Sequence, residues 1–208
     1  MNLTDLAEKG KLPDALIRHG IRRLCRQRLL DEGERDCNAA DGRFRALIES
    51  LKLSPIAIET RAANEQHYEL PTEFFRLCLG KRLKYSSAFY PTGLATLDQA
   101  EEIMLRMYAE RAELEDGQSI LELGCGWGSL TLWMAEHYPN SSITAVSNSA
   151  TQRHHIESQC RERGFGNVTV LTCDVNVLTF EENLFDRCVS IEMFEHMRNY
   201  QTLLNRVA

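Results

Sequence analysis

The sequence predicts an α/β fold with a Rossmann-like parallel sheet, preceded by a helical N-terminal extension. Two observations carry this prediction. After Gly117, short apolar runs alternate with helix-length segments, which is typical of parallel sheets. The first run leads directly into the glycine-rich stretch GCGWG at 124–128 and then into a helix near Ser129, the order of strand, tight turn and helix found in Rossmann-like domains.

Four apolar runs are expected to form the strands, at residues 119–123, 143–146, 168–171 and 188–191. Helices are expected at 129–137, at 151–164 and from near Met197 onward. The second of these helices ends at Gly164, a residue suited to a left-handed helix cap.

The N-terminal half predicts helices. Over 12–30 apolar residues recur at steps of three to five, and the other face carries five arginines. That face is either a solvated surface, the commoner case, or a contact for a membrane or an acidic partner. The charged, glycine-containing stretch 31–43 predicts a turn before a short helix at 44–51. Two further helices are expected at 70–79 and 97–113.

Composition excludes several classes of protein. With 24 Lys+Arg against 30 Asp+Glu, the 208-residue chain has no broad positive field for a nucleic acid, so no nucleic-acid partner is expected. No apolar run approaches the roughly 18 residues of a transmembrane segment. Seven cysteines without C-x-x-C spacing or nearby histidine patterns favour a reduced, cytoplasmic protein with no bound metal.

The glycine stretch indicates a ligand class. Glu122 lies at the end of the preceding strand, where a carboxylate attracts a cation and repels a pyrophosphate. Gly128 falls one position too early for the dinucleotide pattern G-x-G-x-x-G. The spacing therefore favours an adenosine ligand with a positive centre and no phosphates. A tight turn without any ligand is the alternative.

The stretch ILELGCGWG at 120–128 resembles the first motif of S-adenosylmethionine-dependent methyltransferases of the cyclopropane fatty acid synthase superfamily. Further similarity lies in LPDALIR, HYELPTEFF, LKYS, VSNSATQ and SIEMFEHM, which begin at residues 12, 67, 83, 146 and 190. These segments resemble the coclaurine N-methyltransferase-like branch. The resemblance implies a class I methyltransferase fold and S-adenosyl-L-methionine as cofactor.

The resemblance also implies which residues hold the cofactor. Many methyltransferases place an acidic residue after the second strand to bind the ribose, and here Asn148 would take that role. For the residues after the third strand, an ordinary strand-to-loop turn is the alternative. The implied contacts are Tyr85 and Ser86 at the methionine end, Gly124 and Gly126 at the floor, Ser147, Asn148 and Gln152 at the ribose, and Asp174 and Val175 at the adenine.

Glu195 and His196 are the predicted catalytic residues. Methyl transfer needs an unprotonated nucleophile, and an amine arrives largely protonated at neutral pH, so a base is useful. Both residues follow the fourth strand, at the sheet edge where α/β folds bind ligands, and the resemblance implies that they supply this base. His196 would accept the proton, and Glu195 would hold the ammonium and stabilise the imidazolium. The alternative is that Glu192, Glu195 and His196 only cap the following helix.

The resemblance further implies three parts: an N-terminal helical extension at 1–58, a helical cap over the cofactor at 59–116, and a truncated S-adenosylmethionine-binding domain at 117–208. The family's sheet carries additional strands, so we expect the chain to be a fragment or a truncated isoform. An open apolar edge at 188–191 would then favour a homodimer.

Three functions remain open. The first is N-methylation of a small-molecule amine. The second is modification of an acyl lipid, as by cyclopropane-fatty-acyl-phospholipid synthase. Lipid-modifying members use a cysteine after the Tyr-Ser pair to help bind bicarbonate, whereas this chain has Ser87, which weakens the lipid alternative. The third is a catalytically inert fragment that binds the cofactor or a partner.

Overall fold

The structure is a computed structural model that describes residues 3–33, 37–58 and 70–208. The chain divides into two units, Met1–Ser50 and Leu51–Ala208. The larger unit contains the glycine-rich stretch and all the strands, and it therefore carries the candidate site.

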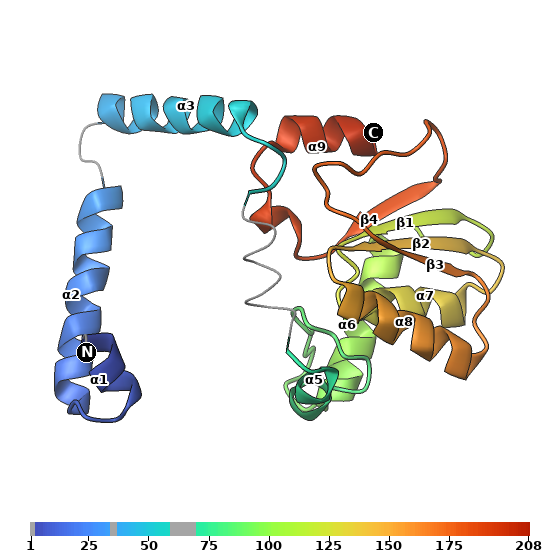
Figure 1. Cartoon of the computed structure of the whole chain (residues 1–208), viewed down its shortest axis with the longest axis horizontal. Coiled ribbons are helices and arrows are strands. Elements are labelled where there is room, and N and C mark those ends of the chain that lie inside the picture. Colours follow the sequence, from blue (N-terminus) through green and yellow to red (C-terminus); the bar gives the residue numbers. More distant parts are fainter. Residues whose placement is uncertain (1–2, 34–36, 59–69) are drawn as a thin grey trace. The chain divides into compact units, whose positions relative to one another are not determined.

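Four parallel strands form one sheet in the order β3-β2-β1-β4, which confirms the predicted fold class (Figure 1). The strands β1 and β2 lie at the centre of the sheet and β3 and β4 at its edges. β4 begins and ends one residue earlier than predicted. The strand bounds are Ser119–Leu123 for β1, Ser142–Ser147 for β2, Val168–Thr172 for β3 and Arg187–Ser190 for β4.

Helices α6 (Leu97–Arg111), α7 (Ser129–His137) and α8 (Ala150–Arg163) pack on one face of the sheet (Figure 1). Alternate strand residues supply the apolar side chains of that face, as the period of two of a strand requires. The buried residues here include Leu105, Trp133, Met134, Ile120, Ile143, Ala145, Ile156 and Val170. The predicted left-handed cap of α8 is confirmed, because Gly164 has φ +73°.

The opposite face packs on the segment after β3 and on α9 (Tyr200–Val207). Leu121, Leu123 and Val146 are buried there beside Leu178. Both faces of the sheet are therefore covered, which leaves the strand ends as the place where α/β folds usually bind ligands.

The helix after β4 begins later than predicted. A short 3-10 turn, η1, spans Phe194–His196, and α9 starts only at Tyr200. The cap of α9 is Asn199, whose side-chain oxygen accepts a hydrogen bond from the Thr202 amide at 3.0 Å. The cap is thus not Glu192, Glu195 or His196, so the alternative that these residues only cap the following helix is wrong.

The smaller unit holds α1 (Leu3–Glu8), α2 (Asp14–Glu32) and most of α3 (Cys37–Leu53). The predicted turn at 31–43 was wrong, because α2 continues to Glu32 and α3 already begins at Cys37. A single glycine inside a helix costs only about 1 kcal/mol relative to alanine, so Gly42 does not end α3. The ion pair between Asp41 and Arg45, at 2.8 Å and four residues apart, supports the helix across this point.

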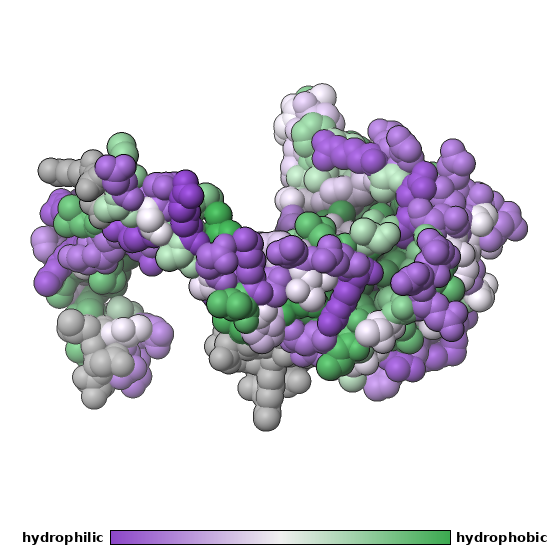
Figure 2. Space-filling model, turned by 90° about the horizontal axis from the view of Figure 1, so that it is seen from above, coloured by the Kyte–Doolittle hydropathy of each residue, from purple (hydrophilic) through white to green (hydrophobic). Residues whose placement is uncertain are grey.

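Helix α2 has no buried residue within the described chain, and several of its apolar side chains are exposed, including Leu16, Leu24 and Leu29. Green apolar patches accordingly lie among the purple surface of the smaller unit, at the left of Figure 2. Among the described helices, none has both the length and the apolar character needed to cross a membrane. A surface or partner contact for the arginines of α2 stays a prediction.

Gly128 provides a test of the turn that positions the site. It has φ +80°, and a Cβ there would lie 2.6 Å from Cγ1 of Ile156 in α8. Gly128→Ala combines a left-handed backbone with a clash, so we expect a loss of about 3 kcal/mol in the free energy of unfolding, measured by denaturant titration.

Gly164 is the matched control, because it has φ +73° but no atom within 4 Å of an added Cβ. Gly164→Ala should cost only about 1 kcal/mol. Equal losses for the two variants would show that the contact with Ile156 does not constrain the turn.

Candidate functional site

The loop between β1 and α7, residues 124–128, is tied to the end of the neighbouring strand β2. The amides of Gly124 and Cys125 both donate to the carbonyl of Val146, each at 3.0 Å. Gly124 has φ +79°, and a Cβ there would meet Met193 at 2.9 Å. The loop thus presses its backbone against the segment that follows β4, and only glycine fits at this position.

A cavity opens beside this loop at the carboxyl ends of all four strands, and we call it the strand-end cavity. Each strand contributes the residues that come directly after or at its end. The residues Ala57 and Ile58, from far earlier in the chain, close one side. The lining comprises Ala57, Ile58, Leu123, Gly124, Gly126, Val146, Ser147, Asn148, Gln152, Cys173, Val175, Leu178, Glu192, Met193, His196 and Met197.

Gln152 brings an unused hydrogen-bond donor to the strand-end cavity. Its side-chain oxygen accepts a hydrogen bond from the Ser147 hydroxyl at 2.6 Å, and the Ser147 oxygen in turn accepts from the Ser149 amide at 3.0 Å. Gln152 is 2% exposed, and its Nε2 has no hydrogen-bond partner among the described residues. Because an unpaired buried donor is costly, this amide indicates an acceptor supplied by a ligand.

A second cavity lies next to the strand-end cavity, and we call it the Tyr85 cavity. The two share Gly124, Gly126 and Glu192, so the glycine loop and Glu192 stand between them. The lining of the Tyr85 cavity comprises Leu83, Lys84, Tyr85, Ser86, Leu105, Tyr108, Glu122, Gly124, Cys125, Gly126, Trp127, Ser129, Leu130, Ile191 and Glu192.

Aromatic packing shapes one wall of the Tyr85 cavity. Phe75 of α5 (Thr72–Cys78) packs against Tyr85, with ring centroids 5.1 Å apart, and against Trp127, with centroids 4.7 Å apart. Phe75 and Trp127 are both 1% exposed. Trp127 therefore forms core under the loop as well as cavity wall, and it fixes the position of Tyr85 through Phe75.

Glu122 is a buried carboxyl group in the Tyr85 cavity. It is 3% exposed, and its Oε2 accepts a hydrogen bond from the Thr131 hydroxyl at 2.5 Å. Burial raises the pKa of Glu122 to about 8, although the Thr131 hydrogen bond acts in the opposite direction. The group is therefore mostly neutral at pH 7, and a cation bound in the cavity would favour its ionised form.

Glu192 is held at the boundary of the two cavities by Ser87. Its Oε1 accepts from the Ser87 amide at 2.9 Å and from the Ser87 hydroxyl at 2.5 Å. Burial acts to raise the pKa of Glu192, but these hydrogen bonds and the charge of Lys84 outweigh it and leave the pKa below its ordinary value. Glu192 is therefore ionised at neutral pH. Its φ of +50° is uncommon for a residue with a side chain.

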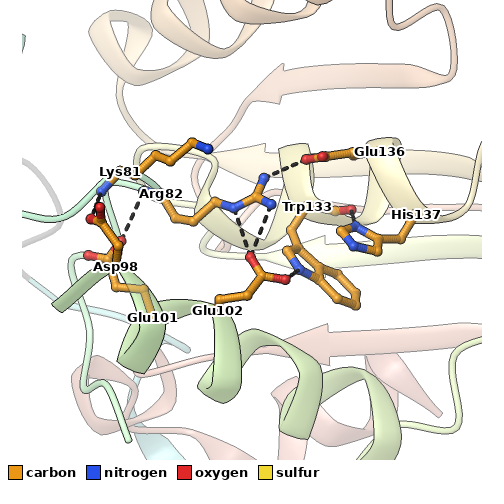
Figure 3. A network of polar contacts seen from close by, with 8 residues as sticks. All are labelled: Lys81, Arg82, Asp98, Glu101, Glu102, Trp133, Glu136 and His137. Carbon is orange, nitrogen blue, oxygen red and sulfur yellow. Dashed lines mark hydrogen bonds and ion pairs between the residues drawn. The ribbon is translucent and has the colours of Figure 1, made fainter. Parts of the chain in front are cut away.

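A polar network holds the turn at residues 80–83, which comes shortly before Tyr85 and Ser86 in the chain (Figure 3). The carboxylate of Glu101, 1% exposed, accepts from the amides of Gly80 and Arg82, both at 2.9 Å. The Arg82 guanidinium pairs with Glu102 at 3.0 Å and with Glu136 at 2.5 Å. These contacts join the turn to α6 and α7, two helices that also line the Tyr85 cavity.

Most of the residues predicted from sequence come together around these two cavities. Two do not line either cavity: Glu195, exposed in η1, and Asp174, whose carboxylate accepts from the Asn176 amide at 2.8 Å. The roles of all these residues stay predictions. The strand-end cavity is lined by Gly124, Gly126, Ser147, Asn148, Gln152, Val175 and His196, and the Tyr85 cavity by Tyr85, Ser86, Gly124 and Gly126.

Some lining residues escaped the sequence reasoning. Leu178 was not singled out, and Met193 and Lys84 were noticed only within the SIEMFEHM and LKYS segments. Ala57 lines the cavity because the Asn176 side chain pairs with both its amide and its carbonyl, each at 3.0 Å. These partners are 119 positions apart in the sequence, so no local signal links them.

The family model described as mycolic acid cyclopropane synthetase matches residues 57–208. The chain belongs to this family. Both cavities and the glycine loop lie within the matched residues.

Known proteins resemble the chain to different extents. It is 38% identical over 200 residues to (S)-coclaurine N-methyltransferase of Thalictrum flavum subsp. glaucum, covering 96% of this chain and 55% of the relative. It is 34% identical over 140 residues to cyclopropane-fatty-acyl-phospholipid synthase of Escherichia coli strain K12, covering 66% of this chain and 35% of the relative.

Among solved structures, coclaurine N-methyltransferase bound to N-methylheliamine and SAH matches with a TM-score of 0.87 and 39% identity. The match covers 99% of this chain and 59% of that chain. The chain thus spans little more than half the length of these two N-methyltransferases.

The pKa of Glu122 gives a test of the Tyr85 cavity. Because the folded state holds the proton up to about pH 8 and the unfolded state releases it near pH 4.5, folding stability should fall as pH rises through this window. Glu122→Gln cannot titrate, so the stability of the wild type relative to this variant should drop by about 1 kcal/mol per pH unit between pH 5 and pH 8. Denaturant titrations of both proteins at several pH values measure this difference in the free energy of unfolding. Parallel stability curves for the two proteins would contradict a neutral buried Glu122.

Proposed function

We propose that the chain binds S-adenosyl-L-methionine across the 124–128 loop and that the protein transfers the methyl group to the nitrogen of a small amine. The observation that carries this proposal is the pair of cavities that meet at the glycine loop, one with the unpartnered Gln152 amide and the other with the buried Glu122 carboxyl. The adenosine would lie in the strand-end cavity and the methionine end in the Tyr85 cavity.

The residues present fit this cofactor. The Gln152 Nε2, which has no hydrogen-bond partner among the described residues, can donate to a hydroxyl or a ring nitrogen of an adenosine. The α-ammonium of the methionine end can pair with the Glu122 carboxylate, because a nearby cation stabilises the ionised form of Glu122. The sulfonium, when bound, supplies an electrophilic methyl group. A similar solved structure supports the assignment, since that coclaurine N-methyltransferase is bound to SAH.

The groups of the chain would prepare the amine. His196 lines the strand-end cavity and would accept the proton of the ammonium form, which frees the nitrogen lone pair. Glu192 is ionised at the boundary of the cavities and would hold the ammonium form of the substrate there. Glu195, beside His196 in η1, would favour the imidazolium by its charge. Together these groups would orient the acceptor toward the Tyr85 cavity.

The amine is proposed over an acyl lipid because more of the chain resembles N-methyltransferases, and because the Ser87 hydroxyl is already engaged by Glu192. We further propose a cytoplasmic protein, supported by seven cysteines without paired spacing. The identity of the amine and a homodimer stay predictions.

A labelling experiment tests the acceptor. The 208-residue chain would be incubated with methyl-labelled cofactor, a panel of cyclic and acyclic amines, and phospholipid vesicles. Label in an amine supports the proposal. Label in phospholipid favours lipid modification, and SAH binding by calorimetry without any label transfer favours an inert cofactor-binding fragment.

Gln152→Met tests the cofactor site. The substitution keeps the length of the side chain but removes the donor, so we expect about tenfold weaker SAH binding by calorimetry. Gln159 lies on the same helix but lines neither cavity, so it gives the matched control Gln159→Met, which should leave SAH affinity unchanged. Unchanged affinity in Gln152→Met would remove the adenosine from this cavity.

His196→Ala tests the base. We expect SAH affinity within about threefold of wild type, because the imidazole is not assigned to the cofactor. Turnover of the best amine at pH 7 should fall by about 100-fold or more. The deficit should shrink as pH approaches the pKa of the amine, since the free base then forms without help. An equal deficit at every pH would argue against proton removal by His196.

A further inference from the structure

Lys84 is a buried cation in the wall of the Tyr85 cavity, and its side chain is fully engaged. It is 3% exposed, and its Nζ donates to Ser86 Oγ at 2.5 Å, to the Ser87 carbonyl at 2.6 Å and to the Tyr108 hydroxyl at 3.1 Å. A lysine ammonium has three N–H donors and no acceptor. All its donors are therefore used, so Lys84 cannot itself hydrogen-bond a ligand without giving up one of these partners.

The bond from Lys84 fixes the polarity of the Ser86 hydroxyl. Because Ser86 Oγ accepts from an ammonium, its own hydrogen must point away from Lys84. The Tyr108 hydroxyl is one acceptor near it, since the same Lys84 ammonium donates to both groups. A carboxylate is a stronger acceptor than a neutral phenol, so a carboxylate in the cavity would take the Ser86 hydrogen.

The surroundings keep Lys84 charged and in place. Burial lowers the pKa of Lys84 to about 8, while the charges of Glu192 and Glu101 act to raise it, so the ammonium predominates at neutral pH. Its backbone lies two residues after Arg82, which Glu101 and Glu102 hold (Figure 3). A positive charge thus stands 2.5 Å behind the Ser86 hydroxyl and increases the strength of that group as a donor.

We propose that Lys84 is a positioning residue that sets the Ser86 hydroxyl as the donor to the carboxylate at the methionine end of the cofactor. This inference rests on the proposed function. With Glu122 in the same cavity for the α-ammonium, the Tyr85 cavity would carry a group for each charge of an amino-acid zwitterion.

A comparison of two ligands tests this inference. SAH has the amino-acid end, whereas 5′-methylthioadenosine shares its adenosine and thioether but lacks the amino acid. In Lys84→Met, calorimetry should show SAH binding weakened by about tenfold or more, with methylthioadenosine binding within about twofold of wild type. Ser86→Ala should show the same selectivity, and the double variant should add little to either single loss, because both changes remove one interaction.

Lys81→Met is the matched control, since Lys81 lies in the same turn with an exposed side chain, and it should leave both affinities unchanged. Ser86→Ala keeps the test valid if Lys84→Met does not fold. Equal loss of both ligands in the Lys84 and Ser86 variants would show a general structural role and overturn the inference, as would unchanged SAH affinity. Failure of the wild type to bind SAH would instead refute the proposed function, and this inference with it.

Discussion

The close approach of the 124–128 loop to its neighbours is the constraint on which the rest of the site depends. The loop must turn from β1 into α7 while its amides remain bonded to Val146 at the end of β2. It must also pass Met193, which follows β4, at a distance that excludes a side chain on Gly124. These contacts bring the ends of three adjacent strands to one point. The two cavities meet there because Gly124 and Gly126, the loop residues that line both, have no side chains.

The buried ionisable groups near the loop differ in their charge state, since one is neutral and another is charged, and a ligand with charged groups can interact with both. Burial favours the neutral form of Glu122, whereas Lys84 keeps its charge through its hydrogen bonds and the carboxylates of Glu192 and Glu101. Glu192 stays ionised because Ser87 donates to it twice. A charged group buried without partners would be costly, so this arrangement fits a cavity that receives charged groups from outside.

The sequence allowed the sheet, its helices and the glycine turn to be predicted because their signals are local. Alternating apolar runs mark the strands, and Gly164 marks the end of α8. The same local reasoning failed at Gly42, where a glycine was taken as a break although the cost of one glycine is smaller than the gain from a continuous helix. It also placed the helix after β4 too early, because the Asn199 cap was not recognised.

The candidate site was predictable only where a motif supplied the residues. The unpartnered amide of Gln152 and the engaged ammonium of Lys84 depend on packing that no local pattern encodes. Glu122 was singled out as an attractive charge, but its burial, and hence its neutral form at pH 7, became visible only with α7 packed above β1.

The strand-end cavity also depends on contacts that are distant in sequence. Asn176 pairs with the backbone of Ala57, and Asn199 donates to the carbonyls of Lys52 and Ser54 at 2.8 and 2.9 Å. The Arg206 guanidinium donates to the carbonyls of Val175, Asn176 and Leu178, at 2.8, 3.0 and 3.2 Å. One wall of the cavity is thus held by side chains from the start of α9, from its last turn and from the segment after β3. A change in any of them would alter the cavity without touching a ligand, so the residues that position this wall extend well beyond those that line it.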